Sequence, residues 1–290
     1  MIAEKSRLSF QKTLAKAVSF SGIGLHTGKK SNVRICPSSA DSGITFIRSD
    51  LSEFNEIKAI WTNVSSTTLS TTISNTKKVS VSTIEHLMSA FSGMHIDNAK
   101  IYIDGPEVPI MDGSSLPFVE LFEKTKTLEQ DKRRKYIQVI KKIEVFKEDS
   151  SASIIPNDQF SIDFEIEFNS PLINKQSCQL RLLNGNYKED ISQARTFGFE
   201  KDVSELRSNG YALGGSLDNA VVIGEKSILN KEGLRFKDEF VRHKMLDSIG
   251  DLYLAGYPVN GFFYGKRSGH FLNNQLLTKL FSNKNNYRII

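Results

Sequence analysis

Three residues that can bind metal or carry protons share one stretch of the sequence, residues 238–251. His243, Asp247 and Asp251 follow one another at steps of four residues. If the stretch is a helix, His243 and Asp247 project side by side from one face. An imidazole and a carboxylate are a usual part of a zinc ligand set, and a catalytic site needs only one more protein ligand and an open position for water. Taken alone, the two residues would fit a surface salt bridge, worth roughly a few tenths of a kcal/mol, even better.

A second candidate pair stands at residues 82–91, where the pattern predicts the start of another helix. Glu85 and His86 fall in its first turn. A glutamate beside a metal-ligating histidine is where a hydrolase keeps a general base, within reach of an activated water. Ser82, three residues before Glu85, also matches a capping box, so a structural role explains Glu85 equally completely.

Histidines also mark two loops. Residues 22–28 (GIGLHTG) predict a glycine-rich turn around His26, which could approach a ligand closely or simply join two strands. Without other evidence, we expect His26 to be a solvated loop residue. His270 follows the loop at residues 265–269 and opens a predicted helix, so it stands at the end of an element, as His86 does.

Length and composition indicate a globular protein. The 290 residues suffice for two domains of ordinary size or one large one, with 39% apolar and 24% charged residues. No apolar tract of about 18 residues could span a bilayer, and the amino terminus lacks the apolar run of an export signal. Cys36 and Cys178 form no paired metal motif, which suits a reducing cytoplasm.

The charge balance argues against nucleic acid as a partner. The net charge is +5, but 38 basic residues are offset by 33 acidic ones. The one dense basic run, at residues 132–135, lies in a polar stretch that resembles a linker. A mild positive excess equally suits an anionic small substrate or a membrane surface.

The order of predicted elements repeats along the chain. Each half contains strands, a helix, a further strand, a loop and a second helix, with helices expected at residues 82–93, 116–124, 238–255 and 270–280. We therefore predict an α+β fold of two similar domains, each a mainly β sheet packed with two helices. The expected boundaries are residues 1–126 for the first domain, 127–136 for a charged linker and 137–290 for the second.

Face-to-face packing of these halves, as a layered β-α-α-β sandwich, would place the active site between the domains. His86, His243 and Asp247 would then form a three-ligand zinc site with water in the fourth position. His270 would be left as an acid or electrostatic stabiliser, with Asp251 holding its imidazole. Several classes of metallohydrolase fit this arrangement.

Six segments carry a resemblance to one known family. They are residues 21–30 (SGIGLHTGKK), 82–87 (STIEHL), 109–114 (PIMDGS), 194–199 (ARTFGF), 233–251 (GLRFKDEFVRHKMLDSIGD) and 268–274 (SGHFLNN). By these segments the chain resembles the UDP-3-O-acyl-N-acetylglucosamine deacetylases, or LpxC family, the zinc amidases of lipid A synthesis. The segments run in the family's order along nearly the whole chain, and the one around His243 is the most specific.

The resemblance implies a cytoplasmic hydrolase that removes the N-acetyl group from UDP-3-O-(3-hydroxyacyl)-N-acetylglucosamine and releases acetate. It assigns the zinc ligands to His86, His243 and Asp247. Glu85 matches the general base, which accepts a proton from the water that zinc activates.

The same resemblance assigns the other roles at the site. Thr196 and zinc stabilise the oxyanion, and protonated His270 provides electrostatic help or acidity for the departing amine. Asp251 orients that histidine. Lys244 and Arg267 are expected to meet the diphosphate, although Arg267 stands where the family more usually has lysine.

Phe168 is expected to stack on the uracil ring. The resemblance also implies a β-α-β insert near residues 197–223 that forms an apolar passage for the fatty acyl chain. By its own composition this segment shows only mixed apolar residues around two glycines, which fits a peripheral structural insert as well.

Two other functional classes are consistent with the same residues. A non-enzymatic binder of nucleotide sugars or nucleic acid could use the basic residues, but it would have no use for Glu85 beside His86. A different zinc amidase would process N-acetyl sugars that lack the UDP or the acyl part. We expect a monomer, because no coiled-coil pattern stands out, and an amphiphilic substrate leaves open a transient contact with the inner-membrane surface.

Overall fold

Two five-stranded sheets form the outer layers of the structure, a computed structural model that describes residues 9–182 and 185–290. The first sheet has the strand order β2-β3-β9-β4-β5, in which only β9 and β4 run parallel. Buried and exposed residues alternate along β3, as expected for a sheet with one face against the core. Its strands are β2 (Val18–Ile23), β3 (Lys30–Pro37), β4 (Ile44–Arg48), β5 (Glu56–Lys58) and β9 (Ala99–Ile103).

The second sheet repeats this connectivity strand for strand. Its order is β12-β13-β19-β14-β15, and again the only parallel neighbours are the late strand β19 and β14. The predicted duplication of the chain is therefore confirmed at the level of topology. The strands are β12 (Ile143–Lys147), β13 (Ser150–Ile155), β14 (Ser161–Glu167), β15 (Lys175–Arg181) and β19 (Phe262–Lys266).

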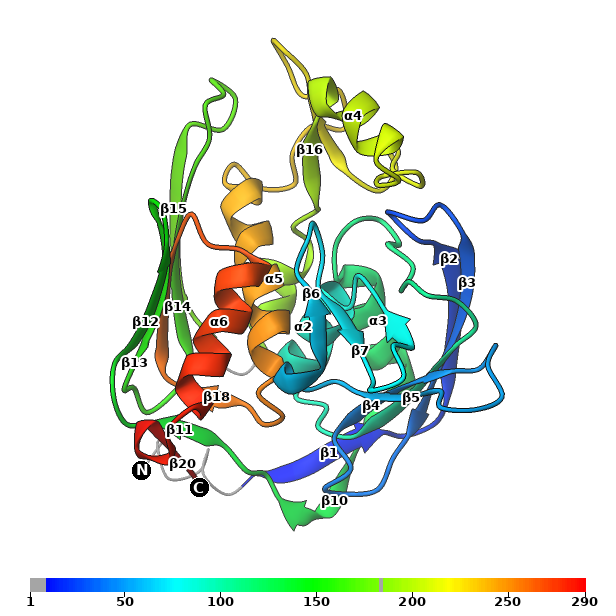
Figure 1. Cartoon of the computed structure of the whole chain (residues 1–290), viewed down its shortest axis with the longest axis vertical. Coiled ribbons are helices and arrows are strands. Elements are labelled where there is room, and N and C mark those ends of the chain that lie inside the picture. Colours follow the sequence, from blue (N-terminus) through cyan, green and yellow to red (C-terminus); the bar gives the residue numbers. More distant parts are fainter. Residues whose placement is uncertain (1–8, 183–184) are drawn as a thin grey trace.

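The longer helices of both halves lie between the two sheets in Figure 1. They are α2 (Glu85–Gly93), α3 (Leu116–Thr125), α5 (Glu239–Tyr253) and α6 (His270–Phe281). Helices α2 and α5 are in direct contact, and a Cβ atom at Gly250 would collide with the backbone carbonyl of Glu85. Helices α2 and α5, which carry His86 and His243, can therefore approach closely only because residue 250 is glycine. The structure is a mixed α+β fold, in which sheets predominate.

Aromatic side chains fill much of the space between helices and sheets. Phe91 stacks on Phe122 within the first half, with ring centroids 4.9 Å apart, and Phe164 stacks on Phe263 within the second. All four are fully buried. Phe91 and Phe122 join α2 to α3, and Phe164 and Phe263 lie on the neighbouring strands β14 and β19, so each stack ties together two elements of one half.

Short strands complete the body. Strand β1 (Phe10–Leu14) pairs with β10 (Thr127–Arg133), so the stretch expected to be a linker contains a paired strand. The remaining short strands are β6 (Val64–Ser66), β7 (Thr72–Ser74), β8 (Ser80–Val81), β11 (Ile137–Val139), β18 (Val259–Asn260) and β20 (Tyr287–Ile289).

A small β-α-β unit projects beyond the layers at the top of Figure 1. It consists of β16 (Phe197–Phe199), α4 (Val203–Ser208) and β17 (Val221–Ile223), with β16 and β17 paired in parallel. We call residues 197–223 the insert. Within the described residues, no helix is both long and apolar enough to cross a membrane.

The capping box predicted at Ser82 and Glu85 is wrong. Helix α2 begins at Glu85, and the residue before it, Ile84, makes no side-chain cap. Thr83 adopts a left-handed backbone conformation with φ of 55°, which turns the chain before the helix starts. Ser82 therefore donates its hydroxyl to the carbonyl of Pro106. Glu85 is left without the structural role that would have explained it.

Candidate active site

Three side chains from the two central helices meet in a buried cluster. His86 lies on α2, and His243 and Asp247 lie on α5. Their potential ligand atoms lie within 4.8 Å of one another. The two imidazoles face each other edge to face, with ring centroids 4.9 Å apart. The structure thus brings together the three residues that the sequence singled out as metal ligands.

His243 is held in the form that a metal requires. Its Nδ1 lies 3.0 Å from the carbonyl oxygen of Ala194, which can accept a hydrogen bond only from a protonated Nδ1. The lone pair of Nε2 then points into the cluster. Burial lowers the pKa of His243 to about 3, against the opposing effect of Asp247, so the imidazole is neutral.

Asp247 supplies the observation that best fits a cation. Its Oδ2 accepts a hydrogen bond from Lys244 Nζ at 2.7 Å. Its buried Oδ1 lies 3.5 Å from His86 Nε2 and 3.4 Å from His243 Nε2, and has no hydrogen-bond partner in the part of the chain that the structure describes. Burial disfavours the charged form of Asp247, but His243 and Lys244 outweigh it and hold its pKa well below the usual range. A buried, charged oxygen between two imidazole nitrogens fits zinc chemistry.

Glu85 lies beside this cluster and is also buried. Its Oε2 accepts a hydrogen bond from the backbone N–H of Thr71 at 3.0 Å, and its Oε1 lies 3.8 Å from His270 Nε2. Burial raises the pKa of Glu85, while His270 and His86 oppose the rise. The pKa of the Glu85 carboxyl group is therefore shifted towards the range in which proton transfer at neutral pH is efficient.

His270 and Asp251 form a hydrogen-bonded pair on the other side of Glu85. His270 Nδ1 lies 2.8 Å from Asp251 Oδ2. Asp251 also accepts hydrogen bonds from the Thr71 hydroxyl at 2.6 Å and from Asn273 Nδ2 at 2.9 Å. Burial would lower the pKa of His270, but Asp251 and Glu85 outweigh it and raise the pKa to about 9. His270 is therefore protonated at neutral pH.

Thr196 and Phe168 both contact the insert. Thr196 directly precedes β16, and its backbone N–H donates to the carbonyl of Gly113 while its carbonyl accepts from Val221. Phe168 packs against two rings of β16, with centroid distances of 5.7 Å to Phe197 and 6.0 Å to Phe199.

The two cations expected at the diphosphate are paired with acidic residues. Lys244 forms an ion pair with Asp247, one of the three candidate metal ligands. Burial alone would lower the pKa of Lys244, but the carboxylate of Asp247 outweighs this effect and raises it. Arg267 forms an ion pair with Glu167 and lies in the loop directly before His270. Both cations therefore stand next to residues of the site.

A family model for the UDP-3-O-acyl N-acetylglycosamine deacetylases, the LpxC family, matches residues 11–282 of the chain. The chain belongs to this family. Three curated relatives are each named UDP-3-O-acyl-N-acetylglucosamine deacetylase. The chain is 49% identical to the one from Geobacter sp. (strain M21), with 97% of the chain and 92% of the relative covered.

The other two relatives come from other organisms. The protein from Syntrophus aciditrophicus is 47% identical over 96% of the chain and 88% of its own length. The protein from Pseudomonas entomophila is 44% identical over 97% of the chain and 93% of its own length. The matched range, residues 11–282, therefore includes both halves of the fold and the positions of the site residues.

Several residues of this LpxC site were given no role from the sequence. Thr71 donates to both Glu85 and Asp251 and lies in a polar stretch without a recognisable local pattern. Asn273 supports Asp251 and lies within residues 268–274, whose resemblance to the family assigns no role to it. The carbonyl of Ala194 fixes the tautomer of His243 from the segment before the insert. Only the three-dimensional arrangement reveals these partners.

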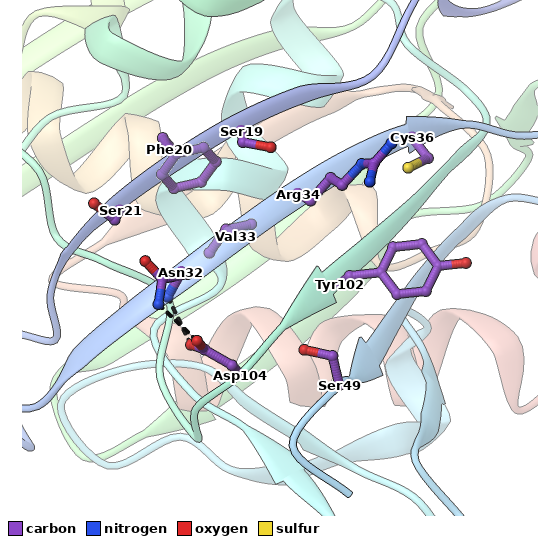
Figure 2. Close-up of a pocket in the computed structure, with 10 residues that line it drawn as sticks. All are labelled: Ser19, Phe20, Ser21, Asn32, Val33, Arg34, Cys36, Ser49, Tyr102 and Asp104. Atoms are coloured by element: carbon purple, nitrogen blue, oxygen red, sulfur yellow. Dashed lines mark hydrogen bonds between the residues drawn. The ribbon is translucent and has the colours of Figure 1, made fainter. Parts of the chain in front are cut away.

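A surface hollow lies elsewhere, on the first sheet (Figure 2). It is lined by residues of β2, β3 and β9 and by Ser49, and Asp104 at its rim accepts two hydrogen bonds from Asn32. None of the residues of the metal cluster, and neither Glu85 nor His270, contributes to it. The hollow is therefore separate from the candidate active site.

Proposed function

We propose that this LpxC protein deacetylates UDP-3-O-(3-hydroxyacyl)-N-acetylglucosamine in a zinc-dependent reaction, producing the free amine and acetate for lipid A biosynthesis. The observation that carries the proposal is the Oδ1 of Asp247, which lies between two imidazole nitrogens and has no hydrogen-bond partner among the described residues, with Glu85 and His270 alongside. The names of its relatives support the substrate.

His86, His243 and Asp247 would hold the zinc ion. When bound, zinc supplies a Lewis acid that lowers the pKa of a water molecule towards neutrality and polarises the amide carbonyl. The carbonyl of Ala194 keeps the nitrogen of His243 available for this ion, and Lys244 occupies only the second oxygen of Asp247.

Glu85 is the general base in this proposal. It takes the proton from the attacking water and retains it in a buried environment, where a raised pKa favours the protonated carboxyl. The N–H of Thr71 fixes one of its oxygens and leaves the other facing His270. The proton is thus held at a defined atom beside the reacting amide.

His270 is the electrostatic stabiliser and acid. Its protonated ring can donate a proton from Nε2 to the departing amine, because Nδ1 is engaged with Asp251. Asp251 stabilises the imidazolium and is itself fixed by Thr71 and Asn273. Thr196, at the start of β16, adds a hydroxyl donor for the oxyanion of the tetrahedral intermediate.

Substrate recognition follows from the surroundings of these residues. Lys244 and Arg267 would meet the diphosphate, for which Arg267 has to leave Glu167, and Phe168 would stack on the uracil. The insert would form the apolar passage for the acyl chain. We further propose two domains, residues 1–126 and 137–290, joined at 127–136 in a β-α-α-β sandwich.

The setting of the reaction is also part of the proposal. A cytoplasmic monomer would meet its amphiphilic substrate by transient contact with the inner-membrane surface, and nucleic acid would have no part in its function.

Substrate truncation tests the assignment against a different zinc amidase. Acetate release is measured with UDP-3-O-acyl-N-acetylglucosamine, with UDP-N-acetylglucosamine and with N-acetylglucosamine. We expect kcat/KM to fall with each truncation, because both the nucleotide and the acyl chain contribute binding energy to the transition state. Equal kcat/KM values for all three would favour the broader amidase, and binding without turnover would favour a non-enzymatic binder.

A further inference from the structure

The glycine-rich loop at residues 22–28 encloses a buried carboxylate of the protein itself. Glu107 is fully buried. Its oxygens accept hydrogen bonds from the backbone N–H groups of His26 and Thr27, both at 2.8 Å, and from the Thr27 hydroxyl at 2.6 Å. A fourth bond comes from the Thr83 hydroxyl at 2.9 Å. These four donors satisfy a carboxylate that would otherwise be costly to bury.

The glycine at position 24 is required by this carboxylate. A Cβ atom there would collide with Glu107 Oε2, because the loop wraps tightly around the side chain. The glycine-rich turn therefore makes a close approach to Glu107. His26 is half-buried rather than the solvated loop residue expected from the sequence, and this burial lowers its pKa, although the charge of Glu107 opposes the shift.

The same loop is also hydrogen-bonded to the insert. The carbonyl of His26 accepts the N–H of Leu213 at 3.2 Å, and the carbonyl of Leu25 accepts the N–H of Gly214 at 3.0 Å. The imidazole of His26 meets Tyr211 edge to face, with ring centroids 5.5 Å apart. In Figure 1 this contact lies where the tip of β2 approaches the insert below α4.

The inner side of the same carboxylate reaches the catalytic helix. Thr83 stands two residues before Glu85, at the left-handed turn from which α2 starts. Its hydroxyl is anchored on Glu107 Oε1, the oxygen that also accepts the N–H of His26. One side chain thus ties the start of α2 to the loop that carries the insert.

We propose that Glu107 is a positioning residue that couples two parts of the site. Through Thr27 and the backbone of the loop, Glu107 fixes the position of the insert and thereby affects recognition of the acyl chain. Through Thr83 it sets the turn that presents Glu85 and His86. The inference rests on the proposed function for its kinetic consequences, whereas its structural consequence can be measured without any activity.

Glu107→Gln is the most direct variant. Each carboxylate oxygen receives one backbone N–H and one hydroxyl hydrogen. A hydroxyl can rotate to accept a hydrogen bond, but a backbone N–H cannot, so either orientation of the amide leaves one backbone donor of the loop facing an NH2 group. Asp104→Asn is the matched control, because Asp104 lies on the same segment, is exposed and bonds only to Asn32 among the described residues.

Two milder variants separate the two sides of the coupling. Thr27→Val removes the hydroxyl that donates to Glu107 and accepts the N–H of Lys29 on the loop side. Thr83→Val removes the bond to Glu107 on the helix side. For Thr27→Val we expect the ratio of kcat/KM for the 3-O-acyl substrate over that for UDP-N-acetylglucosamine to fall about three- to tenfold, with kcat retained. For Thr83→Val we expect kcat to fall by a similar factor on both substrates, with the ratio unchanged.

Hydrogen exchange provides the readout that does not depend on activity. In Glu107→Gln we expect faster exchange of the amides of His26, Thr27, Leu213 and Gly214, and in Asp104→Asn the wild-type rates. If Glu107→Gln does not fold, exchange in Thr27→Val and Thr83→Val decides the question. Wild-type exchange in both threonine variants, with an unchanged ratio in Thr27→Val and an unchanged kcat in Thr83→Val, would overturn the inference. A wild-type enzyme inactive on both substrates would overturn the proposed function, and exchange would then test the coupling alone.

Discussion

Asp251 and His270 are joined by a 2.8 Å hydrogen bond between Oδ2 and Nδ1, which leaves Nε2 of the histidine facing Glu85. Asp251 lies near the end of α5 and His270 at the start of α6. Thr71 brings a third segment to the pair, since it donates its hydroxyl to Asp251 and its N–H to Glu85. The candidate base and the candidate acid therefore share one hydrogen-bonded framework.

Asp251→Asn should weaken catalysis through His270. The neutral amide no longer stabilises the imidazolium, so the pKa of His270 falls and less of it is protonated at neutral pH. We expect kcat to fall about 10- to 100-fold, with the alkaline limb of the pH profile moved to lower pH. Steady-state kinetics over a pH series measures both. Asp163→Asn, on the second sheet, serves as the control, and a wild-type profile for Asp251→Asn would refute the role of Asp251.

The raised pKa of His270 also predicts a pH dependence of stability. In the metal-free protein the folded-state pKa is about 9, against 6.5 for a free imidazole. Between pH 6.5 and about 9 the folded state therefore binds more protons than the unfolded state. The stabilisation is fully present below about pH 6.5 and is lost as the pH rises through about 9.

Two measurements check this dependence. An NMR titration of His270 in chelated protein gives the pKa, and urea unfolding across the same pH range gives the free energy of unfolding. His270→Gln should remove the pH-dependent contribution. Titration of His270 near pH 6.5 would contradict the expected charge of the site.

Glu85→Gln should separate metal binding from turnover. The amide keeps the size of the side chain and can still accept from Thr71, but it cannot take a proton from water. We expect kcat to fall about 10²- to 10⁴-fold while the bound zinc stays stoichiometric, as measured by metal analysis of the same samples. Glu123→Gln, an exposed partner of Lys188, should retain full activity. Loss of zinc together with activity would indicate that Glu85 is a ligand instead.

Gly250→Ala should disturb the contact between the two halves. The added methyl group would strike the carbonyl of Glu85, so α2 and α5 have to move apart. We expect a loss of about 1–3 kcal/mol in the free energy of unfolding, with reduced activity, because overpacking a tight contact shifts the backbone. Gly198→Ala meets no atom within 4 Å and should leave stability nearly unchanged in the same denaturant titration.

The sequence was most informative where its patterns are local. The stretch around His243 predicted a helix at residues 238–255, and α5 spans Glu239–Tyr253. The four-residue step from His243 to Asp247 placed both on one face, and the repeated order of elements was enough to bring His86 opposite them. Helical periodicity and duplication are properties of short segments or of their order, so they can be recognised from the sequence alone.

The features of the fold and the site that the sequence did not predict depend on contacts between distant segments. The capping box was a valid local pattern, but Thr83 turns the chain and Glu85 bonds instead to Thr71. The glycine-rich turn gave no sign that its partner was Glu107, about 80 residues further along the chain. Such pairings are decided by how the layers pack, which a single sequence does not encode in any local spacing.

The central claim is a zinc-dependent deacetylation by His86, His243, Asp247 and Glu85. The decisive measurement is acetate release from UDP-3-O-acyl-N-acetylglucosamine by purified protein, before chelation, after chelation and after stoichiometric zinc is restored. We expect activity to vanish on chelation and to return with zinc. A folded, zinc-loaded protein that releases no acetate would contradict the substrate assignment, and full activity in the chelated protein would contradict the metal site.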